Sequence, residues 1–181
     1  LEYNLNLLKK YNITEIAILA EYSEEEIKDY FQDGGDFGVT LTYFNKKTSI
    51  NEIKNFFSEE NFLVASGSFL TNINLYEAIE AHQKKECLST VIVTNSPQVV
   101  DATVVQCEKG NEVTSFLSVT DQTEKFPKNI STGIFILESE ILDYTAKIPE
   151  DILKFLLEEN IECFAAEAKG SWFGLGILEQ Y

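Results

Sequence analysis

The sequence contains no arginine and no methionine. Its fourteen basic residues are therefore all lysines, and thirty acidic residues bring the formal charge to −16 at neutral pH. A surface of this sign repels nucleic acid and anionic lipid, because binding to either depends on cations that neutralise phosphate. We expect neither a nucleic acid nor a membrane as a partner. Since no initiator methionine is present, we also expect the chain to be part of a longer product.

Long apolar runs and metal-binding patterns are missing as well. No run approaches the ~20 residues of a membrane-spanning helix, and the first residues are amphipathic rather than signal-like, so we expect a cytoplasmic protein. The single histidine and the lack of a C-x-x-C pair exclude the common zinc patterns. Cys87, Cys107 and Cys163 are interpreted as reduced core thiols. The length of 181 residues, 44% of them hydrophobic, predicts a single domain over 1–181.

Apolar periodicity predicts helices and strands that alternate through the first half of the chain. This order is typical of a largely parallel sheet with helices on both faces. Ser23 and Ser49 each precede a glutamate by three residues, which is the capping-box pattern of a helix start. The predicted helices cover 1–10, 23–31, 49–57 and 75–85, and the predicted strands cover 15–20, which we expect to be buried, 39–44, 62–66 and 88–94.

The second half of the chain has more strand and less helix, which predicts a mixed, partly antiparallel extension of the sheet. A parallel sheet that opens with a helix is incomplete, so we expect helix 1–10 to cross over from an earlier strand outside this chain. The second half is predicted to hold strands at 102–107, 113–118, 131–137 and 161–166, helices at 138–144 and 149–159, and a tight glycine-rich passage at 170–176.

The predicted strand 62–66 runs directly into the loop Ser66-Gly67-Ser68. Loops at the carboxyl edge of an open α/β sheet are where such folds bind ligands and place catalytic groups. Here the loop offers hydroxyls, whereas phosphate or metal chemistry would favour a carboxylate.

Five segments, taken together, carry a resemblance to a known family. They are EEIKDYFQDGGDFGVTLTYF (25–44), FLVASGSFLTNINL (62–75), AIEAHQKK (78–85), STGIFILESEILDY (131–144) and SWFGLG (171–176). In order and spacing they resemble the sugar-1-phosphate nucleotidyltransferases, or NDP-sugar pyrophosphorylases, and most nearly the mannose-1-phosphate guanylyltransferase-like branch. The resemblance implies an α/β protein with the Rossmann-like three-layer α/β/α nucleotide-diphospho-sugar transferase fold. Its sheet would be mixed and mainly parallel, and the first strand and glycine-rich loop would lie outside this chain.

The resemblance also implies a reaction and a metal. Family members combine a nucleoside triphosphate with a sugar 1-phosphate, release pyrophosphate and use Mg²⁺. Ser68 stands where the family's Gly-Asp loop has a metal-binding aspartate, and Gly174 stands where its Trp-x-Asp passage has the second one. With both carboxylates replaced, we expect no metal ligand, catalytic residue or cofactor in this chain; Mg²⁺ is expected only if the chain is an active enzyme.

Several substrate positions of the family depart from its pattern too. A turn laid against the nucleotide matches 47–50 without its glycine, a Glu-Lys-Pro passage matches 118–120, and Ser131 replaces an asparagine. Lys46, Lys47, Lys125 and Lys128 flank the expected cleft, either as a local basic patch or as solvated loop lysines. The substrate-binding set that the resemblance implies is Gly67, Ser68, Thr48, Ser131, Thr132, Gly133 and Trp172.

Three functions stay open at this point. The first is a nucleotidyltransferase-like pseudoenzyme with weak or no activity, which senses a nucleotide or sugar phosphate or regulates a partner domain or a homo-oligomer. The second is an active NDP-sugar pyrophosphorylase that transfers a nucleotidyl group to a sugar 1-phosphate. The third is a protein-interaction module that binds no nucleotide. His82, at the edge of the apolar stripe of helix 75–85, is interpreted as a packed histidine without a catalytic role.

Overall fold

The structure of the chain, a computed structural model, describes residues 1–20, 22–57, 61–95, 102–119, 128–146, 149 and 151–174. The predicted alternation of helix and strand is confirmed, and one helix covers the predicted residues 75–85 without a shift. The elements follow in this order: α1 (Glu2–Lys10), β1 (Glu15–Leu19), α2 (Glu24–Phe31), the 3-10 helix η1 (Gly35–Phe37), β2 (Thr40–Phe44), α3 (Ile50–Phe57), β3 (Phe62–Ala65), β4 (Phe69–Thr71), α4 (Leu75–Lys85), β5 (Ser89–Thr94), β6 (Ala102–Cys107), β7 (Val113–Val119), β8 (Ile130–Leu137), the 3-10 helix η2 (Ser139–Tyr144), α5 (Ile152–Glu158), β9 (Cys163–Glu167) and β10 (Trp172–Gly174).

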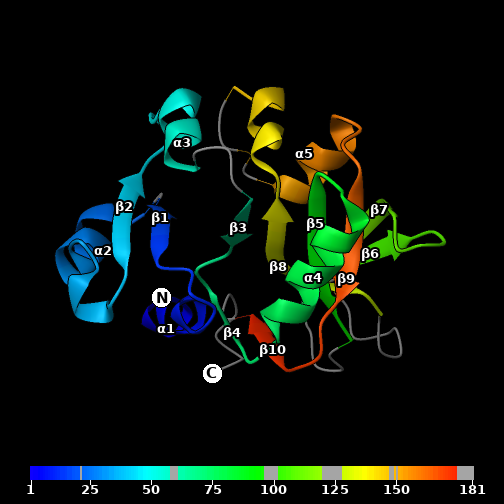
Figure 1. The fold of residues 1–181 in the computed structure, drawn as a ribbon, viewed down its shortest axis with the longest axis horizontal. Coiled ribbons are helices and arrows are strands. Elements are labelled where there is room, and N and C mark those ends of the chain that lie inside the picture. Colours follow the sequence, from blue (N-terminus) through cyan, green and yellow to red (C-terminus); the bar gives the residue numbers. More distant parts are fainter. Residues whose placement is uncertain are drawn as a thin grey trace.

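The strands form two main groups, which lie side by side in Figure 1. β1 and β2 make a parallel two-stranded sheet. In the larger group β8 is central: it pairs antiparallel with β3 and with β5, and β5 pairs parallel with β9. β3, β5 and β9 therefore run in one direction and β8 in the other, which is the mixed sheet that the resemblance implies. The hairpin of β6 and β7 joins the larger sheet where β6 pairs with β8, through Val104 and Ile130.

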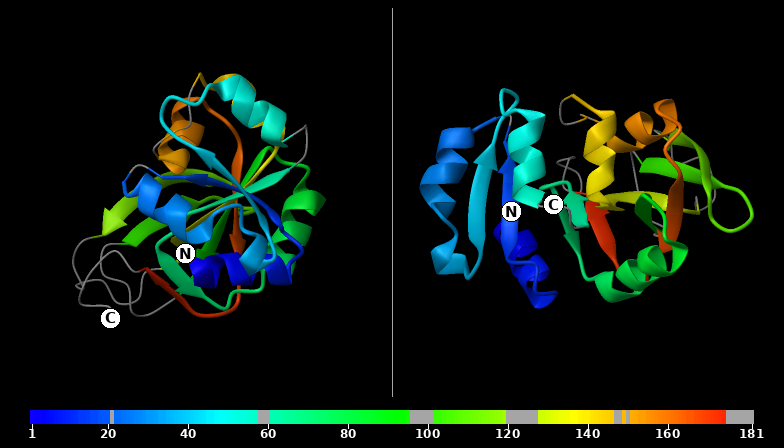
Figure 2. Two further views of the ribbon diagram at one scale, coloured as in Figure 1. Left: turned by 90° about the vertical axis from the view of Figure 1, so that its left-hand side faces the viewer. Right: turned by 45° about the horizontal axis from the view of Figure 1, so that its top comes forward.

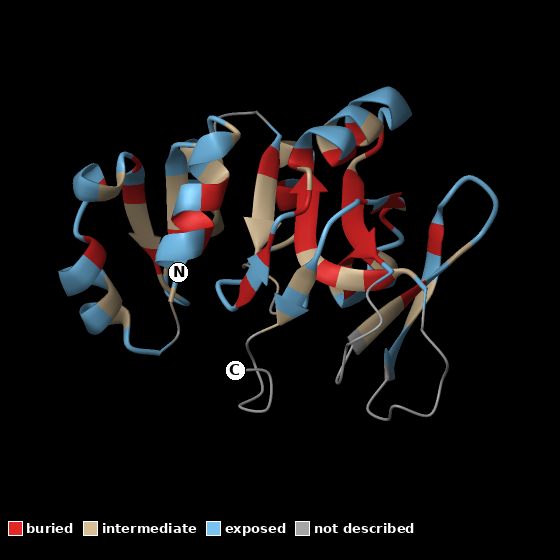
Figure 3. Ribbon diagram, turned by 90° about the horizontal axis from the view of Figure 1, so that it is seen from below, coloured by how far each residue is buried: buried red, intermediate tan, exposed pale blue. Residues whose placement is uncertain are grey.

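Helices cover both faces of the larger sheet. Val91 and Val93 of β5 belong to a hydrophobic cluster that contains residues of α3, η2 and α5. Ile92 lies between them in sequence and belongs to a second cluster, with residues of α1 and α4. Successive side chains of a strand point to opposite faces, so the sheet lies between two helix layers (Figure 2). The α/β/α architecture is confirmed, and Figure 3 shows the buried residues concentrated in the strands of the larger sheet.

The two predicted capping boxes have different outcomes. At α3 the Ser49 hydroxyl accepts a hydrogen bond from the Glu52 amide at 3.3 Å, so this cap is confirmed. The prediction at Ser23 is wrong: its side chain makes no cap hydrogen bond, and its backbone is left-handed with φ of 52°. A serine cap needs an extended backbone to bring its oxygen back to the amides of the first turn. The left-handed conformation at Ser23 prevents this.

The prediction that strand 15–20 is buried is only partly met. Ile18 of β1 is buried, but Ile16 and Ala17 are half-buried and Leu19 is 40% exposed. β1 is hydrogen-bonded to β2 along one edge and to no other strand in the described part of the chain. An apolar strand with one edge unpaired keeps part of its surface accessible.

The glycine-rich passage at 170–176 is partly a strand rather than a turn. Trp172 to Gly174 form β10, which pairs antiparallel with β4, a short strand that the sequence pattern did not predict. Three-residue strands are too short for a periodicity signal. Their pairing depends on residues about one hundred positions apart, which local patterns do not encode.

His82 of α4 is packed inside the protein, as interpreted from its position. It is 1% exposed, its Nδ1 lies 2.9 Å from the Thr90 hydroxyl, and its Nε2 lies 3.1 Å from a Glu138 carboxylate oxygen. Both ring nitrogens thus have partners within the fold. Among the described residues, no helix has the length and apolar character that crossing a membrane requires.

Candidate functional site

The loop after β3, Ser66 to Ser68, is stabilised by hydrogen bonds between its own two serines. The oxygens of Ser66 and Ser68 lie 3.0 Å apart, and the Ser68 amide donates to the Ser66 oxygen at 3.3 Å. The Ser66 amide donates to the carbonyl of Gly133 in β8, also at 3.3 Å. All three loop residues are exposed, so the loop presents two hydroxyls and backbone groups to solvent at the end of a sheet strand.

The two positions that the resemblance marks as metal sites do lie together. In the ladder of β4 and β10, Gly174 is opposite Phe69, the residue that directly follows Ser68. Neither position carries a carboxylate: one offers a hydroxyl already bonded to Ser66, and the other has no side chain. The ladder therefore brings positions 68 and 174 near one another, and neither position carries an acid.

This donor set does not fit Mg²⁺. Magnesium requires near-octahedral oxygen ligands and is bound in proteins through one or two carboxylates together with substrate phosphates. Neutral hydroxyls supply neither the charge nor the ligand number. In the described ranges, no group of three or more histidine, cysteine, aspartate or glutamate side chains is placed to hold a metal ion.

Next to the loop, β8 contains three consecutive residues of the predicted substrate-binding set, Ser131 to Gly133, and they do not all face the loop. Gly133 has a φ of +71°, and its amide donates to the Ser131 hydroxyl at 3.3 Å. Thr132 points away from these two: it is 0% exposed, and its hydroxyl donates to the Ile92 carbonyl at 2.8 Å. Ser131 and Gly133 are thus presented beside the loop, while the Thr132 side chain bonds within the sheet.

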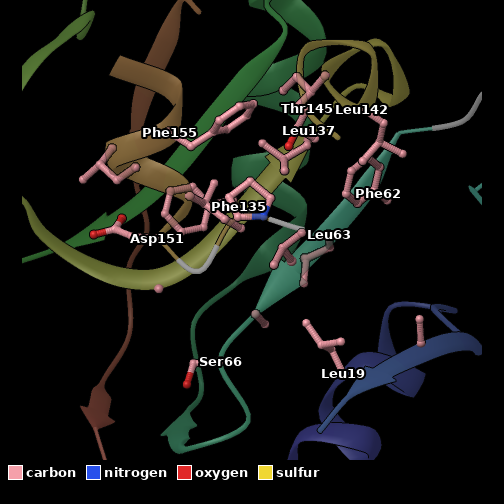
Figure 4. Close-up of a pocket in the computed structure, with 18 of the residues that line it drawn as sticks. Leu19, Phe62, Leu63, Ser66, Phe135, Leu137, Leu142, Thr145, Asp151 and Phe155 are labelled. Carbon is pink, nitrogen blue, oxygen red and sulfur yellow. The ribbon is translucent and has the colours of Figure 1, made fainter. Parts of the chain in front are cut away.

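A cavity of about 830 Å³ extends from this loop between the two groups of strands (Figure 4). Its polar end is formed by Ser66, Gly67, Ser131 and Gly133, so the structure brings together four residues of the loop and of β8. The rest of the wall is mainly apolar. Among the described lining residues Asp151 is the one charged side chain, and its carboxylate accepts a hydrogen bond from the Lys154 amide at 3.0 Å. Among the residues that the structure describes, no lysine lines the cavity.

Other predicted residues lie outside the cavity wall. Thr48 closes a turn after β2, where its hydroxyl accepts a hydrogen bond from the Asn45 amide at 3.0 Å. Lys47 and Lys128 are exposed and do not line the cavity. Lys125 and Thr120 fall outside the described residues. The substrate-binding role of Thr48 stays a prediction, as do the roles of the residues in the polar end.

Trp172 packs at the base of the loop. It is half-buried, pairs with Thr71 across the ladder and lies against the cluster that contains Phe69 and Ile73. Its indole Nε1 is buried and has no hydrogen-bond partner among the described residues. This contact places Trp172 in the scaffold of the loop.

Asn4 of α1 is a site residue that the sequence reasoning missed. Its Nδ2 donates to the Gly67 carbonyl at 3.0 Å, while its Oδ1 is buried and without a partner among the described residues. Tyr3 and Tyr11 of the same helix donate from their hydroxyls to the carbonyls of Thr71 and Ile73. α1 therefore holds the loop and β4 in place. In the sequence, Asn4 is a polar residue among the leucines of helix 1–10, which could have marked it as a buried contact. The sequence analysis interpreted that helix only as a crossover between strands.

The cysteines are free thiols, and two of the three are buried. Burial raises the pKa of the Cys163 thiol to about 11, because a thiolate would lose its hydration there. Burial also raises the pKa of the partly exposed Cys107. These shifts oppose the thiolate form that nucleophilic cysteines need. The interpretation as reduced core thiols agrees with the structure for Cys87 and Cys163, whereas Cys107 is free but only half-buried.

Comparison with known proteins identifies the family of this chain. The family model described as nucleotidyl transferase matches residues 1–181. The chain belongs to the nucleotidyl transferase family.

Among curated relatives, the UTP–glucose-1-phosphate uridylyltransferase of Synechocystis sp. is 25% identical over all of this chain and 53% of its own length. The low-salt glycan biosynthesis nucleotidyltransferase Agl11 of Haloferax volcanii is 21% identical over 97% of this chain and also 53% of its own length. The chain thus spans about half the length of these relatives. Neither name mentions mannose 1-phosphate or a guanylyl group, so the mannose-1-phosphate guanylyltransferase-like branch stays a prediction.

Solved structures share the fold. HddC from Yersinia pseudotuberculosis superimposes with a TM-score of 0.79 at 17% identity, covering 99% of this chain and 81% of that one. A UDP-glucose pyrophosphorylase complexed with UDP-glucose superimposes with a TM-score of 0.71 at 18% identity, covering 99% of this chain and 82% of that one. At these identities the likeness concerns the arrangement of the chain only.

Proposed function

We propose that this chain is a sugar-1-phosphate nucleotidyltransferase-like domain that binds a sugar phosphate or nucleotide with weak or no transfer activity of its own. Its role would then be to sense such a ligand or to regulate a partner. The family assignment supports the ligand class, and the composition of the candidate site supports the loss of transfer.

One observation carries the proposal. The family resemblance implies metal-binding aspartates at positions 68 and 174. In the ladder of β4 and β10, Gly174 pairs with Phe69, the residue directly after Ser68. If each missing carboxylate removes ~3 kcal/mol of transition-state stabilisation, the two together remove about four powers of ten in rate. A scaffold that keeps this meeting point without acids is suited to binding more than to phosphoryl chemistry.

The cavity lining supports the same choice of ligand. Its polar end offers the hydroxyls of Ser66 and Ser131 with backbone groups, and no lysine is found among the lining residues that the structure describes. Sugar hydroxyls are matched by neutral donors and acceptors of this kind. A triphosphate carries more negative charge than a sugar phosphate, and the formal charge of −16 opposes its approach unless a cation accompanies it.

Isothermal titration tests the proposal on the purified chain. The titrants are glucose 1-phosphate and mannose 1-phosphate, then UTP and GTP, each with and without Mg²⁺, and pyrophosphate release is followed in parallel. We expect sugar 1-phosphate binding that Mg²⁺ does not strengthen, and no pyrophosphate release above background. Magnesium-dependent triphosphate binding with pyrophosphate release would show an active enzyme and refute the proposal. No binding of any titrant would also refute it, in favour of an interaction module.

A further inference from the structure

β7 is the last strand at one end of the larger sheet. Within the part of the chain that the structure describes, it pairs with β6 along one edge and with no strand along the other. Just before β7 begins, Glu112 makes a single bridge to Phe164 of β9. Figure 1 and Figure 3 show the hairpin of β6 and β7 at one margin of the molecule. One edge of β7 is therefore open to a further strand.

The open edge presents the backbone groups of Phe116 and Ser118. In β6 the amide of Val105 donates to the Asn129 carbonyl at 2.9 Å, toward the start of β8 and so away from β7. Val105 is opposite Phe116 in the ladder, so these two residues exchange no hydrogen bonds with each other. Phe116 therefore directs its amide and carbonyl outward, and Ser118, two residues later, does the same.

This edge lacks the features that usually prevent strand edges from pairing. Charged side chains and proline are the common ones. Residues 113–119 contain neither, and the same holds for residues 102–107 of β6, although 24% of the whole chain is charged. A bulge interrupts the ladder only at its hairpin end, and residues 115–119 pair regularly. Leu117, at the centre of this regular stretch, is 52% exposed. The edge is thus neutral, regular and accessible.

We propose that this edge of β7 pairs with the same edge of a second copy of the chain, antiparallel and across a two-fold axis at Leu117. In this register Phe116 of each copy is opposite Ser118 of the other, and each such pair exchanges two backbone hydrogen bonds. The two Leu117 residues meet at the axis, where opposite residues without hydrogen bonds have Cα atoms about 4.5 Å apart. Their contact covers apolar surface that is exposed in the single chain.

Charge favours this edge as the contact between two copies. Each copy carries a formal charge of −16, so contact between most surfaces brings like charges together. Residues 115–119 are all uncharged, so in the proposed register no like charges lie opposite one another. A two-fold contact also requires one surface that complements itself. A strand that pairs antiparallel about its own central residue meets this requirement without a second site.

The pairing extends to one wall of the candidate site. Phe116 lines the cavity of about 830 Å³ and packs against the hydrophobic cluster that contains Val105 and Val113. In the dimer the backbone of Phe116 is bonded to a strand of the second copy, so this wall opens less readily than a free strand edge does. The second copy thus supports the cavity wall from outside and does not occupy the cavity.

Sedimentation velocity tests the proposal on the unmodified chain. Two short strand edges bury little area, so we expect a dissociation constant of about 10–100 μM, seen as a monomer–dimer equilibrium between about 5 and about 500 μM. Raising the salt from about 20 to about 200 mM should lower the dissociation constant, because salt screens the repulsion between two acidic copies. A chain that stays monomeric over this whole concentration range would overturn the proposal.

A variant pair locates the contact. Leu117→Lys places two like charges at the axis, whereas the matched control Thr114→Lys adds the same charge to β7 outside the paired residues 115–119. Both positions are exposed, so both variants should melt as folded proteins. We expect Leu117→Lys to weaken dimerisation by about tenfold or more and Thr114→Lys by less than about twofold. Equal weakening by both variants, or none by Leu117→Lys, would overturn the proposal.

A cysteine cross-link tests the register. Both proteins carry Cys107→Ser, since Cys107 is a half-buried free thiol. Leu117→Cys then places two thiols at opposite positions, with Cα atoms about 4.5 Å apart and within the range of a disulfide. In the control Thr114→Cys the two thiols lie about 20 Å apart along the paired strands. With oxidised glutathione, we expect a covalent dimer from Leu117→Cys only.

Equal cross-linking of the two cysteine variants, or none of Leu117→Cys, would overturn the proposal. None of these measurements uses a nucleotide or sugar, so their outcome is independent of the proposed function.

Discussion

Gly174 of β10 pairs with Phe69 of β4, and the residue before Phe69 is Ser68. This pairing brings two positions near one another where a carboxylate can be introduced: Ser68 is exposed and Gly174 is half-buried. We predict that the double variant Ser68→Asp, Gly174→Asp binds Mg²⁺ more tightly than the unmodified chain, because paired carboxylates supply the charge that magnesium requires. Titration with Mg²⁺ by calorimetry measures the gain.

The control for this prediction is Thr114→Asp, which adds an acid on the exposed edge strand β7. Single variants at Ser68 and at Gly174 should each bind more weakly than the double variant. Equal Mg²⁺ affinity in the double variant and in Thr114→Asp would show that the two positions do not converge on one ion.

Ser131 and Thr132 are neighbours with different expected roles. Thr132→Val removes a buried hydroxyl that donates to the Ile92 carbonyl at 2.8 Å, and we expect it to lower the free energy of unfolding by about 1–3 kcal/mol. Ser131→Ala changes a cavity-lining hydroxyl and should alter stability by less than about 0.5 kcal/mol. Urea unfolding of the two variants measures both values, and an equal loss in both would contradict this division.

Gly34 and Gly35 are neighbours, but only Gly34 has a positive φ, so alanine substitutions at the two positions test the effect of backbone conformation on stability. Gly34 has a φ of +84°, and a Cβ there would lie 2.8 Å from the Val39 carbonyl oxygen and 2.7 Å from a Leu41 side-chain carbon. At Gly35 the nearest atom is the Asp33 side-chain oxygen at 3.2 Å. We expect Gly34→Ala to cost at least about 2 kcal/mol and Gly35→Ala less than about 1 kcal/mol. Thermal unfolding of the two variants, side by side, distinguishes these outcomes.

From the raised pKa of the Cys163 thiol we predict that the free energy of unfolding falls in alkaline solution. Its pKa is about 11 in the folded chain, above the ordinary value of 9.0, because burial disfavours the thiolate. Between these two pH values the unfolded chain releases the proton and the folded chain keeps it, so the free energy of unfolding falls as pH rises through this window. The full difference corresponds to about 2–3 kcal/mol.

Urea unfolding near pH 8 and near pH 10 measures this loss. Lysine and tyrosine side chains titrate in the same range, so the comparison is with Cys163→Ala, which should lose less stability over the same interval. In the folded protein at pH 8, Cys163 should also resist iodoacetamide, since its thiol is protonated and buried. The same pH dependence in the variant and in the unmodified chain would contradict the assignment.

The sequence predicted most elements because their periodicity is local. The apolar stripe of α4 and the serine cap of α3 depend on residues within one or two turns of the same helix, and both were predicted correctly. The strand β1 was located correctly, but its exposure was not, because exposure depends on which edges are paired. The cap at Ser23 failed for a related reason: a left-handed backbone there is not visible in the pattern of residue types.

The candidate site was predicted in part. The loop Ser66-Gly67-Ser68 and its neighbours in β8 were found from the strand-to-loop pattern and the family resemblance, and the structure brings Ser66, Gly67, Ser131 and Gly133 to one cavity. Asn4 was missed, because its contact with Gly67 spans 63 positions in the chain. No local signal links two residues at that separation.

The sequence by itself determined the order of helices and strands, the family and the absence of carboxylates at Ser68 and Gly174, because these follow from residue types and short spacings. Only the tertiary structure decided that Gly174 lies beside Phe69 and that Thr132 points away from the cavity. These features arise from hydrogen bonds and packing between distant segments. Their register is set by the whole sheet rather than by any one stretch of sequence.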